Sequence, residues 1–254
     1  MEVTFLGTGT SHGIPVIGCN CKVCQSPNPR NRRNRTGVWV HDSQRSLVID
    51  VSSEFRIASL QYGLKRLDLA LLTHAHSDHI SGLDDLRIFS QVTGKPTLLC
   101  GDENTFADLR KRFDYAFAPP KNYGGGTPQF ELKVITEPFV WEGWVITPLP
   151  VWHGPDPIIG WRINNFAFIT DVTIIPDSTL QLLQGLDILA LDCLRKAPHS
   201  THLHLAQSIA YAEQIKARRS YMVHLAHELE HDETESELPE NCFVAYDGLT
   251  LKSD

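Results

Sequence analysis

One segment of this chain joins a buried strand to a cluster of metal-binding side chains, and it restricts the fold more than any other part of the sequence. Leu67–Thr73 reads as an apolar strand, and residues 72–82, which overlap its end, read LTHAHSDHISG. The metal-binding side chains that follow are His74, His76, Asp78 and His79. A buried imidazole or carboxylate needs a polar partner, and both groups are common zinc ligands. We therefore expect a metal site at the end of a buried strand.

The spacing of these residues suits two metal ions. In a tight turn, His74 and His76 would face one side, while Asp78 and His79 would face another. Two ions about 3.5–4 Å apart activate a water molecule and stabilise the leaving oxygen of a displacement. Such a site needs more ligands from elsewhere in the chain, including one that bridges the ions.

Three later polar residues could complete the site, because each follows an apolar strand. His153 ends ITPLPVWH, Asp171 ends FAFITD and His224 ends RSYMVH. Residues at the carboxyl ends of neighbouring strands meet at one edge of a sheet. A strand-terminal aspartate alone is as readily a turn or helix cap, and this alternative stays open for Asp171. The three residues together with the His/Asp turn favour a shared site.

Strands alternate with a few helices along the whole chain. Short apolar and alternating segments predict strands at Val3–Leu6, Val38–Val40, Ser46–Val51, Leu67–Thr73, Pro96–Leu99, Phe130–Ile135, Trp144–Pro150, Gly160–Ile163, Phe166–Thr170, Asp187–Asp192, Ser220–His224 and Phe243–Ala245. Helices are predicted at Ser53–Tyr62, Gly82–Phe89, Thr105–Phe113, Pro176–Gln184 and Leu205–Arg218. Because strands dominate with helices between them, a layered α/β sandwich fits best. We expect one domain over residues 1–254.

The bulk properties of the chain bear on its compartment and partners. We see no signal peptide and no apolar run of about 20 residues, so we expect a cytoplasmic protein without a membrane span. The net charge of −7 disfavours a general nucleic-acid binder. The basic run PRNRRNR at residues 29–35 could touch nucleic acid or a sugar phosphate, although such runs are usually solvated.

Two further segments are predicted to be surface loops. Residues 117–129 are rich in proline and glycine and could form a flap, and residues 227–241 are acidic.

Three of the six cysteines lie close together in GCNCKVC, at residues 18–24: Cys19, Cys21 and Cys24. In a cytoplasmic protein, disulfides are rare and clustered cysteines more often bind metal. The cluster therefore favours a metal site over a disulfide.

The HxHxDH motif and the later His, Asp and His residues resemble those of the metallo-β-lactamase superfamily. The resemblance runs from FLGTGTSHGIP near the start to VAYDG near the end. It implies a four-layer αβ/βα sandwich with a binuclear site at one edge. It implies one ion on His74, His76 and His153, a second on Asp78, His79 and His224, and Asp171 as the bridge. Asp50, which ends SLVID, matches an early aspartate of the family that supports the site or only caps a turn.

Within this superfamily, the chain is similar to the PhnP-like phosphodiesterases of phosphonate metabolism. GTGTSHGIPVIGCNCKVC matches their TGT-type turn and C-x-C-x-x-C loop, and VHLAH matches their C-terminal histidine pair. The resemblance implies that His227 completes a structural zinc site with Cys19, Cys21 and Cys24, in a loop at about 18–35. A closed Cys3His set suits structural zinc.

The chain departs from the family pattern in PHSTHLHLAQ, where three histidines stand in place of one. His202 matches best, and we expect it to contact the phosphate or protonate the leaving oxygen. His199 and His204 stay alternatives, as does a solvated loop without a role in the site. Asp78 is expected to be catalytic as well as a metal ligand.

The expected activity is hydrolysis of a small cyclic phosphodiester, such as a ribose 1,2-cyclic phosphate, with two divalent ions. The N and O ligands would accept Zn, Mn or Fe. Nucleic acid is a less favoured partner, no membrane partner is expected, and a homodimer stays open. The alternatives are a tRNA 3′-processing nuclease, a thioester or lactam hydrolase on the same metal pair, and a non-catalytic zinc-binding protein. The complete set of seven candidate ligands disfavours the last of these.

Overall fold

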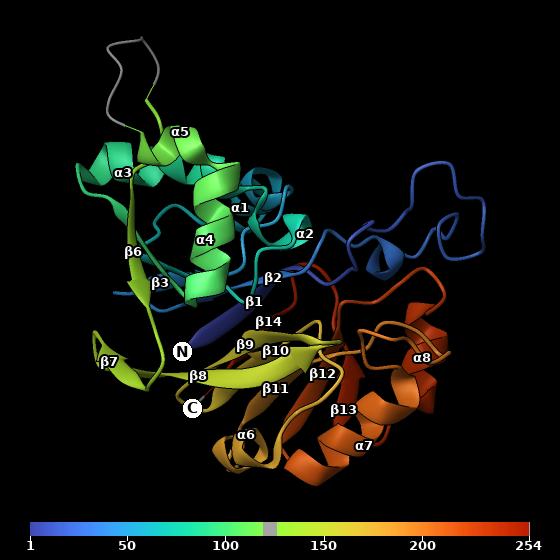
Figure 1. Cartoon of the computed structure of the whole chain (residues 1–254). Helices are drawn as coiled ribbons and strands as arrows, with labels where there is room; N and C mark the ends of the chain where they lie inside the picture. The colour runs from blue at the N-terminus through green and yellow to red at the C-terminus, as the bar shows by residue number, and fades with distance from the viewer. Residues whose placement is uncertain (119–125, 254) are drawn as a thin grey trace.

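Two β-sheets stack face to face, and helices cover their outer faces (Figure 1). The structure is a computed structural model that describes residues 1–118 and 126–253. Within these residues, the strand order of the first sheet is β14 (Thr250–Lys252), β1 (Glu2–Gly7), β2 (Gly37–His41), β3 (Ser46–Ile49), β4 (Leu69–Leu71), β5 (Thr97–Gly101), β6 (Phe130–Val134). The order of the second is β13 (Cys242–Val244), β12 (Arg219–Val223), β11 (Ile188–Asp192), β10 (Phe166–Ile169), β9 (Asp156–Ile163), β8 (Trp144–His153), β7 (Phe139–Trp141).

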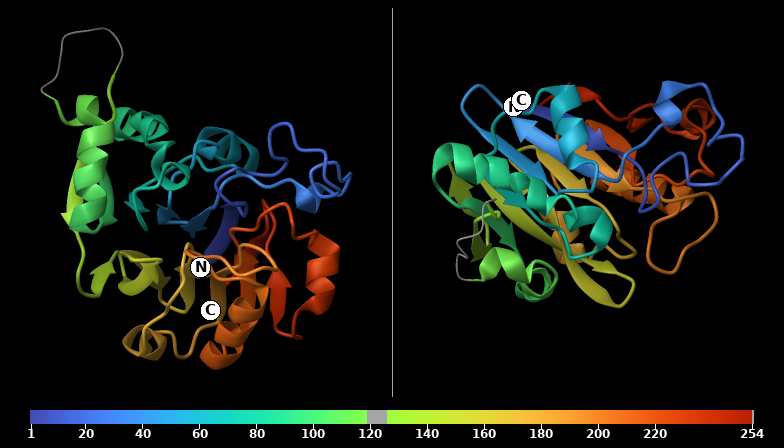
Figure 2. Two further views of the ribbon diagram at one scale, coloured as in Figure 1. Left: turned by 45° about the vertical axis from the view of Figure 1, so that its right-hand side comes forward. Right: turned by 90° about the horizontal axis from the view of Figure 1, so that it is seen from above.

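The helices fall into two sets, one for each sheet (Figure 2). The first set is α1 (Phe55–Tyr62), α2 (Ser77–Ile80), the 3-10 turn η2 (Leu83–Leu86), α3 (Arg87–Thr93), α4 (Glu103–Arg112) and α5 (Asp114–Phe117). A further 3-10 turn, η1 (Pro29–Asn31), lies in the long N-terminal loop, where Asn31 accepts from the N–H of His231 at 2.8 Å. The second set is α6 (Asp177–Leu182), α7 (Leu205–Ile215) and α8 (His231–Glu237). The predicted four-layer αβ/βα sandwich is confirmed.

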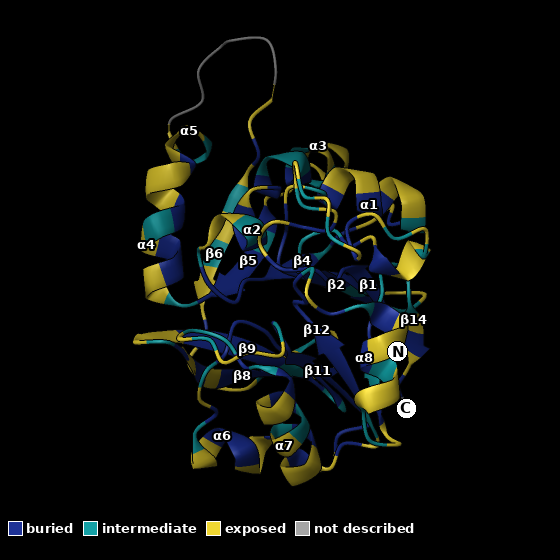
Figure 3. Ribbon diagram, turned by 90° about the vertical axis from the view of Figure 1, so that its right-hand side faces the viewer, coloured by how far each residue is buried: buried dark blue, intermediate teal, exposed yellow. Residues whose placement is uncertain are grey.

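The main apolar core lies between the two sheets, where both contribute side chains (Figure 3). Phe5 of the first sheet and Phe168 of the second are fully buried there. Strands covered on both faces read as continuous apolar runs, as Phe166–Ile169 does. Trp161 donates from its indole Nε1 to the carbonyl of Leu72, at 3.1 Å, which joins the second sheet to the first just before the His/Asp turn.

The parallel strands of both sheets end at a common edge. Strands β3 to β6 are parallel to one another, as are β10 to β13. Three non-glycine residues just beyond these strands have positive φ: Asp50 at 62°, Asp171 at 57° and His224 at 61°. Such backbone conformations cost about 1–3 kcal/mol each and gather at functional sites. The edge therefore combines converging strand ends with a strained backbone.

The predicted strands are all present, with ends that differ by a few residues. Strands β7 and β14 were missed because three residues are too few to display a period. The helix predicted at Gly82–Phe89 is wrong in its bounds: a 3-10 turn opens it, and α3 continues to Thr93. Gly94 ends α3 with φ of 67°, a conformation that glycine adopts readily.

One of the two predicted surface loops is wrong, and the other lies largely outside the described residues. Residues 227–241 contain helix α8, in which His231 and Thr234 are buried. Glu230 caps this helix by accepting from the backbone N–H of Glu233, at 2.9 Å, and acidic residues favour a helix N-terminus. In the other segment, α5 reaches Phe117, and residues 119–125 lie outside the described residues. Among the helices of the described residues, none has the length and apolar character that crossing a membrane requires.

Candidate metal centre

The His/Asp turn lies where β4 leaves the first sheet. His74 and His76 precede α2, whereas Asp78 and His79 lie in its only turn. The turn is held to the end of β3, because the N–H of Val51 donates to the carbonyl of His79 at 2.7 Å. Strand and helix geometry thus send the two halves of the motif in different directions.

The structure brings the seven predicted ligands together in two groups, and within each group the ligand atoms lie within 4.8 Å of one another. The first group is His74, His76, His153 and Asp171. The second group is Asp78, His79, Asp171 and His224. The division between the groups is the one expected from the sequence, and Asp171 is the residue they share.

The carboxylate of Asp171 lies between the two groups. Its Oδ2 is 3.3 Å from Nε2 of His79 and 3.4 Å from Nε2 of His224. Its other oxygen, Oδ1, faces the first group and lies 4.0 Å from Nε2 of His74. One carboxylate therefore offers one oxygen to each group, which is the arrangement that a bridging ligand requires.

Unpaired buried nitrogens test whether these residues fit metal ions. The Nε2 atoms of His74, His79 and His224 are buried and have no hydrogen-bond partner among the described residues. Buried polar atoms without a partner are costly and rare in folded proteins. Here three such nitrogens lie around shared carboxylates. The donor atoms of the site are all nitrogen or oxygen, and this set fits divalent cations.

Outer contacts direct the ring nitrogens toward the centre. His79 donates from Nδ1 to Oδ2 of Asp50, at 2.7 Å, and Asp50 also accepts from the N–H and hydroxyl of Thr73. His153 donates from Nδ1 to the carbonyl of Thr201, at 2.7 Å. Metal-binding histidines usually have such partners, which fix the ring and its tautomer. The geometry fits the supporting role expected for Asp50.

The charges at this edge are arranged for cations. Burial raises the pKa of the Asp171 carboxyl, but the imidazoles of His224 and His79 hold it well below its usual value. Burial lowers the pKa of His79, but Asp171, Asp50 and Asp78 raise it well above its usual value. Burial, with the nearby His79, lowers the pKa of His74. Asp171 is thus ionised, and metal binding would displace the proton of His79.

Of the three histidines in PHSTHLHLAQ, His202 lies at the centre. Its ring stacks on that of His224, with centroids 4.9 Å apart and planes 10° apart, and its Nδ1 is 3.9 Å from Oδ1 of Asp171. His199 lies next to His202, and the centroids of these two rings are 5.1 Å apart. His204 is instead the N-cap of α7, where its ring contacts the Gln207 amide.

Asp192 also lies at this site, although it was not among the predicted residues. Its side chain is fully buried at the end of β11, and its Oδ2 accepts from the N–H of Leu203 at 3.0 Å. The two carboxylate oxygens face Nδ1 of His202, at 3.5 Å, and Nδ1 of His224, at 3.6 Å. The signal was present, since Asp192 ends an apolar strand just as Asp171 does.

The cysteine cluster lies beside the centre and makes no disulfide, since all six cysteines are free. His227 Nδ1 is 3.3 Å from the sulfur of Cys19, 3.6 Å from that of Cys21 and 3.4 Å from that of Cys24. A backbone N–H of Cys24 helps to lower the pKa of Cys21 to about 7. These four side chains fit a closed tetrahedral metal site.

The basic run at residues 29–35 is not a solvated loop throughout. Arg33 is buried, and its Nη1 donates to the Thr8 hydroxyl, at 2.8 Å. That hydroxyl donates in turn to Oδ1 of Asp247, at 2.7 Å, and burial raises the pKa of Asp247 to about 7. Arg35 pairs with Glu54. These arginines tie the loop to the body of the protein, which leaves Arg30 and Arg32 as its exposed cations.

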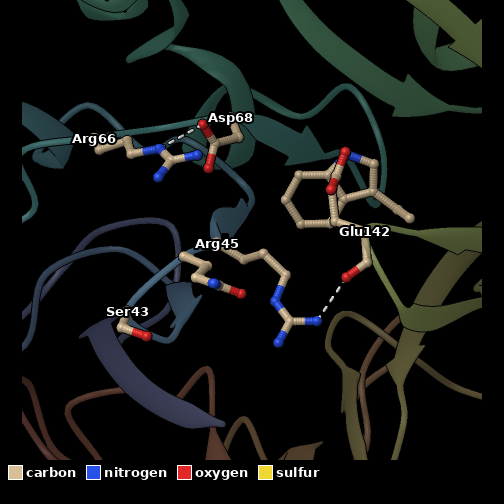
Figure 4. Close-up of a pocket in the computed structure, with 7 residues that line it drawn as sticks. Ser43, Arg45, Arg66, Asp68 and Glu142 are labelled. Atoms are coloured by element: carbon tan, nitrogen blue, oxygen red, sulfur yellow. Dashed lines mark hydrogen bonds and ion pairs between the residues drawn. The ribbon is translucent and has the colours of Figure 1, made fainter.

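A second edge of the molecule holds a cavity of about 620 Å³, at the opposite ends of β3 and β8 (Figure 4). Its arginines are engaged within the protein. Arg66 pairs with Asp68 at 2.7 Å, and Arg45 donates to the carbonyl of Glu142 at 2.6 Å. This cavity shares no residue with the ligand groups, so we assign function to the metal-centre edge.

Known proteins resemble the chain over most of its length. The model of the Beta-lactamase superfamily domain matches residues 45–225. The crystal structure of a new diphosphatase from the PhnP family has 39% identity and a TM-score of 0.92, covering 100% of this chain and 98% of that one. The octanoyltransferase of Porphyromonas gingivalis is 35% identical over 98% of this chain and 51% of its own length. A ribonuclease Z of Mycobacterium bovis is 29% identical over 77% of this chain and 71% of its own length.

These matches include the residues that build the metal centre. The family model begins before Asp50 and ends after His224. The likeness to the diphosphatase extends over the cysteine loop as well. By contrast, the chain spans about half of the octanoyltransferase. The chain therefore belongs to the beta-lactamase superfamily and, within it, to the PhnP family.

Proposed function

We propose that this protein is a metal-dependent phosphodiesterase that holds two divalent ions, Zn, Mn or Fe, and acts on a small cyclic phosphodiester such as a ribose 1,2-cyclic phosphate. The observation that carries the proposal is Asp171, whose two oxygens face separate ligand groups. Two-ion sites of this kind favour in-line displacement at phosphorus. The similar diphosphatase of the PhnP family supports a phosphoryl substrate.

In this proposal the chain positions the ions and the proton donor. Bound divalent ions would supply an activated water and neutralise charge on the phosphoryl oxygens. The first ligand group would hold one ion, the second group the other, and Asp171 both. Asp50 and the carbonyl of Thr201 keep His79 and His153 turned toward the centre. Asp78 carries negative charge at the second ion position.

His202 is the proposed proton donor to the leaving oxygen. Oδ2 of Asp192 lies 3.5 Å from its Nδ1, so a protonated Nδ1 would face a carboxylate and Nε2 would serve the substrate. A carboxylate that fixes the tautomer and stabilises the charged ring serves histidine in this way in other hydrolases. The stacked ring of His224 limits the rotation of His202.

We also propose that Cys19, Cys21, Cys24 and His227 hold a structural zinc ion. Only Leu225 and Ala226 separate His227 from His224, a ligand of the second group. The zinc would therefore anchor the segment that delivers His224. This link explains how a non-catalytic cysteine loop supports the centre.

The proposal is tested by metal analysis and a substrate panel on reconstituted protein. The panel holds an aryl phosphodiester, a ribose 1,2-cyclic phosphate, 2′,3′-cyclic nucleotides, a pre-tRNA and an octanoyl thioester. We expect three metal ions per chain and preferred turnover of the ribose cyclic phosphate. The Asp171→Ala variant should lose active-site metal and about 10³-fold or more of the rate, whereas His204→Ala should retain both. Full metal content in Asp171→Ala would refute the bridging role.

A tRNA 3′-processing nuclease is the second candidate, because the ribonuclease Z of Mycobacterium bovis is similar over most of this chain. The net charge of −7 and the engagement of Arg33 and Arg35 within the protein weigh against RNA, whose binding depends on phosphate contacts. Cleavage of the pre-tRNA without turnover of cyclic phosphates would favour this candidate. Preferred turnover of the octanoyl thioester would instead favour acyl chemistry, as the name of the Porphyromonas gingivalis relative suggests.

A further inference from the structure

One loop supplies both a contact to the first ligand group and the proposed proton donor. It covers residues 195–204, between β11 and α7, and we name it the His202 loop. The carbonyl of Thr201 accepts from Nδ1 of His153 at 2.7 Å. The ring of His202, the next residue, has its centroid 4.9 Å from that of His153. A shift of this loop would therefore move the proton donor and disturb a metal ligand.

The two ends of the His202 loop are fixed by backbone hydrogen bonds. The N–H of Leu194 donates to the carbonyl of Leu203 at 3.0 Å. The N–H of Leu205 donates to the carbonyl of Arg195 at 2.9 Å. In the described part of the chain, no backbone–backbone hydrogen bond reaches residues 196–202. Because polar backbone groups need partners, the middle of the loop depends on side chains and water for its shape.

Arg195 supplies hydrogen bonds to the middle of the loop from its first position. Its Nε donates to the carbonyl of Ala197 at 3.2 Å, and its Nη2 donates to the carbonyl of Pro198 at 2.9 Å. A guanidinium group carries its donors in a fixed planar arrangement, so it can hold two carbonyls at set positions. Arg195 therefore curls the start of the loop around its own side chain.

A second contact continues from this curl toward the metal centre. Nδ1 of His199 accepts from the N–H of Thr201 at 3.3 Å and lies 3.2 Å from the Thr201 hydroxyl. The Pro198 carbonyl that Arg195 holds belongs to the peptide group that leads into His199. A continuous chain of contacts thus runs from Arg195 through His199 and Thr201 to the first ligand group.

We propose that Arg195 is a positioning residue for the reaction, acting through the His202 loop to hold His202 beside the leaving oxygen. Without the guanidinium, the carbonyls of Ala197 and Pro198 lose their charged donor, and the His202 ring would occupy other positions. A displacement of about 1 Å can cost about 10²-fold in rate. This inference deepens the proposed phosphodiesterase function and rests on it.

The test uses two phosphodiesters that differ only in their need for a proton donor, methyl 4-nitrophenyl phosphate and methyl phenyl phosphate. Nitrophenolate is a stable anion that leaves without a proton, whereas phenolate is more basic and gains more from a proton donor. A general acid contributes about 10²–10⁴-fold. We expect Arg195→Ala to lower kcat about 10- to 100-fold for the phenyl ester, but less than about threefold for the nitrophenyl ester.

The ratio of these two kcat values is a readout that a purely structural role would not change. Both substrates meet the same enzyme, so the ratio does not depend on the fraction of protein that is folded and metal-loaded. Lys196→Ala is the matched control, because this cation lies in the same loop but pairs with Glu237 of α8. The control should change the ratio less than about twofold. Added guanidinium should return the ratio of Arg195→Ala toward that of wild type.

A double-mutant cycle and hydrogen exchange complete the test. In a His202→Ala background, Arg195→Ala should change the ratio less than about twofold, because residues that act as one unit have non-additive effects. The backbone amides of residues 199–202 should exchange at least about threefold faster in Arg195→Ala than in wild type or Lys196→Ala.

An unchanged ratio in Arg195→Ala, whether from equal losses on the two esters or from full activity on both, would overturn this inference and leave the proposed function in place. Absence of turnover on both esters by the metal-loaded wild type would overturn the proposed function and this inference with it.

Discussion

Replacing Asp192 with asparagine tests the part of the centre that the sequence did not reveal. The carboxylate is fully buried and faces Nδ1 of both His202 and His224. It also accepts from the N–H of Leu203. An asparagine side chain has one acceptor oxygen, so it can accept from only some of these three donors. Its N–H₂ group would face at least one imidazole N–H.

The expected loss of activity depends on whether one or both imidazole rings, those of His202 and His224, lose their carboxylate partner. Loss of an outer partner of a metal-site histidine costs about 10- to 100-fold in activity or metal affinity, or about 1.4–2.7 kcal/mol. We therefore expect Asp192→Asn to lower kcat/KM for an aryl phosphodiester about 10- to 100-fold. If both rings lose their orientation, the loss should approach about 10³-fold.

Asp187→Asn is the matched control, since Asp187 is a buried carboxylate at the other end of β11. It pairs there with Arg218 at 2.7 Å. This change should lower stability but leave kcat/KM within about twofold. The reasoning is refuted if Asp192→Asn keeps full activity and metal content. It is also refuted if the two variants lose activity equally, because the effect would then come from the fold.

Two further predictions concern regions outside the proposed active site. Cys21→Ser should lower the zinc content by about one ion and the free energy of unfolding by on the order of 4 kcal/mol, as measured by atomic absorption and urea denaturation. Lost activity with fold and active-site metals intact would contradict the structural role. Burial raises the pKa of Asp247 from 3.8 to about 7, so the folded state binds the extra proton and this residue's contribution to stability falls as pH rises from about 4 to 7. Relative to wild type, Asp247→Asn should therefore gain stability over this range, by at most about 4 kcal/mol. Urea denaturation at several pH values measures this difference, and a pH-independent difference would contradict the raised pKa.

The local pattern of the sequence predicted most of the fold and most of the candidate site. Apolar strands such as Phe166–Ile169 are buried on both faces, so their sequence carries a strong signal. Helix α8 was missed because its residues are mostly acidic, and only its tertiary position buries His231 and Thr234. The basic run was misjudged for the same reason, since the partners of Arg33 lie at Thr8, Ala245 and His231.

The candidate ligand types can be read from the amino-acid order, because a strand that ends in His or Asp brings that side chain to the edge of its sheet. This order therefore identified the His/Asp turn, His153, Asp171 and His224. How these groups face one another follows from the fold alone. The Asp171 oxygens point to separate groups, and His202 rather than His204 joins them. The physical reason is that these relations depend on backbone conformation at strand ends and on contacts between distant segments, such as Asp192 with His202 and His224. A linear pattern records the chemistry available at each strand end, but the distances between strand ends are set by how the two sheets pack.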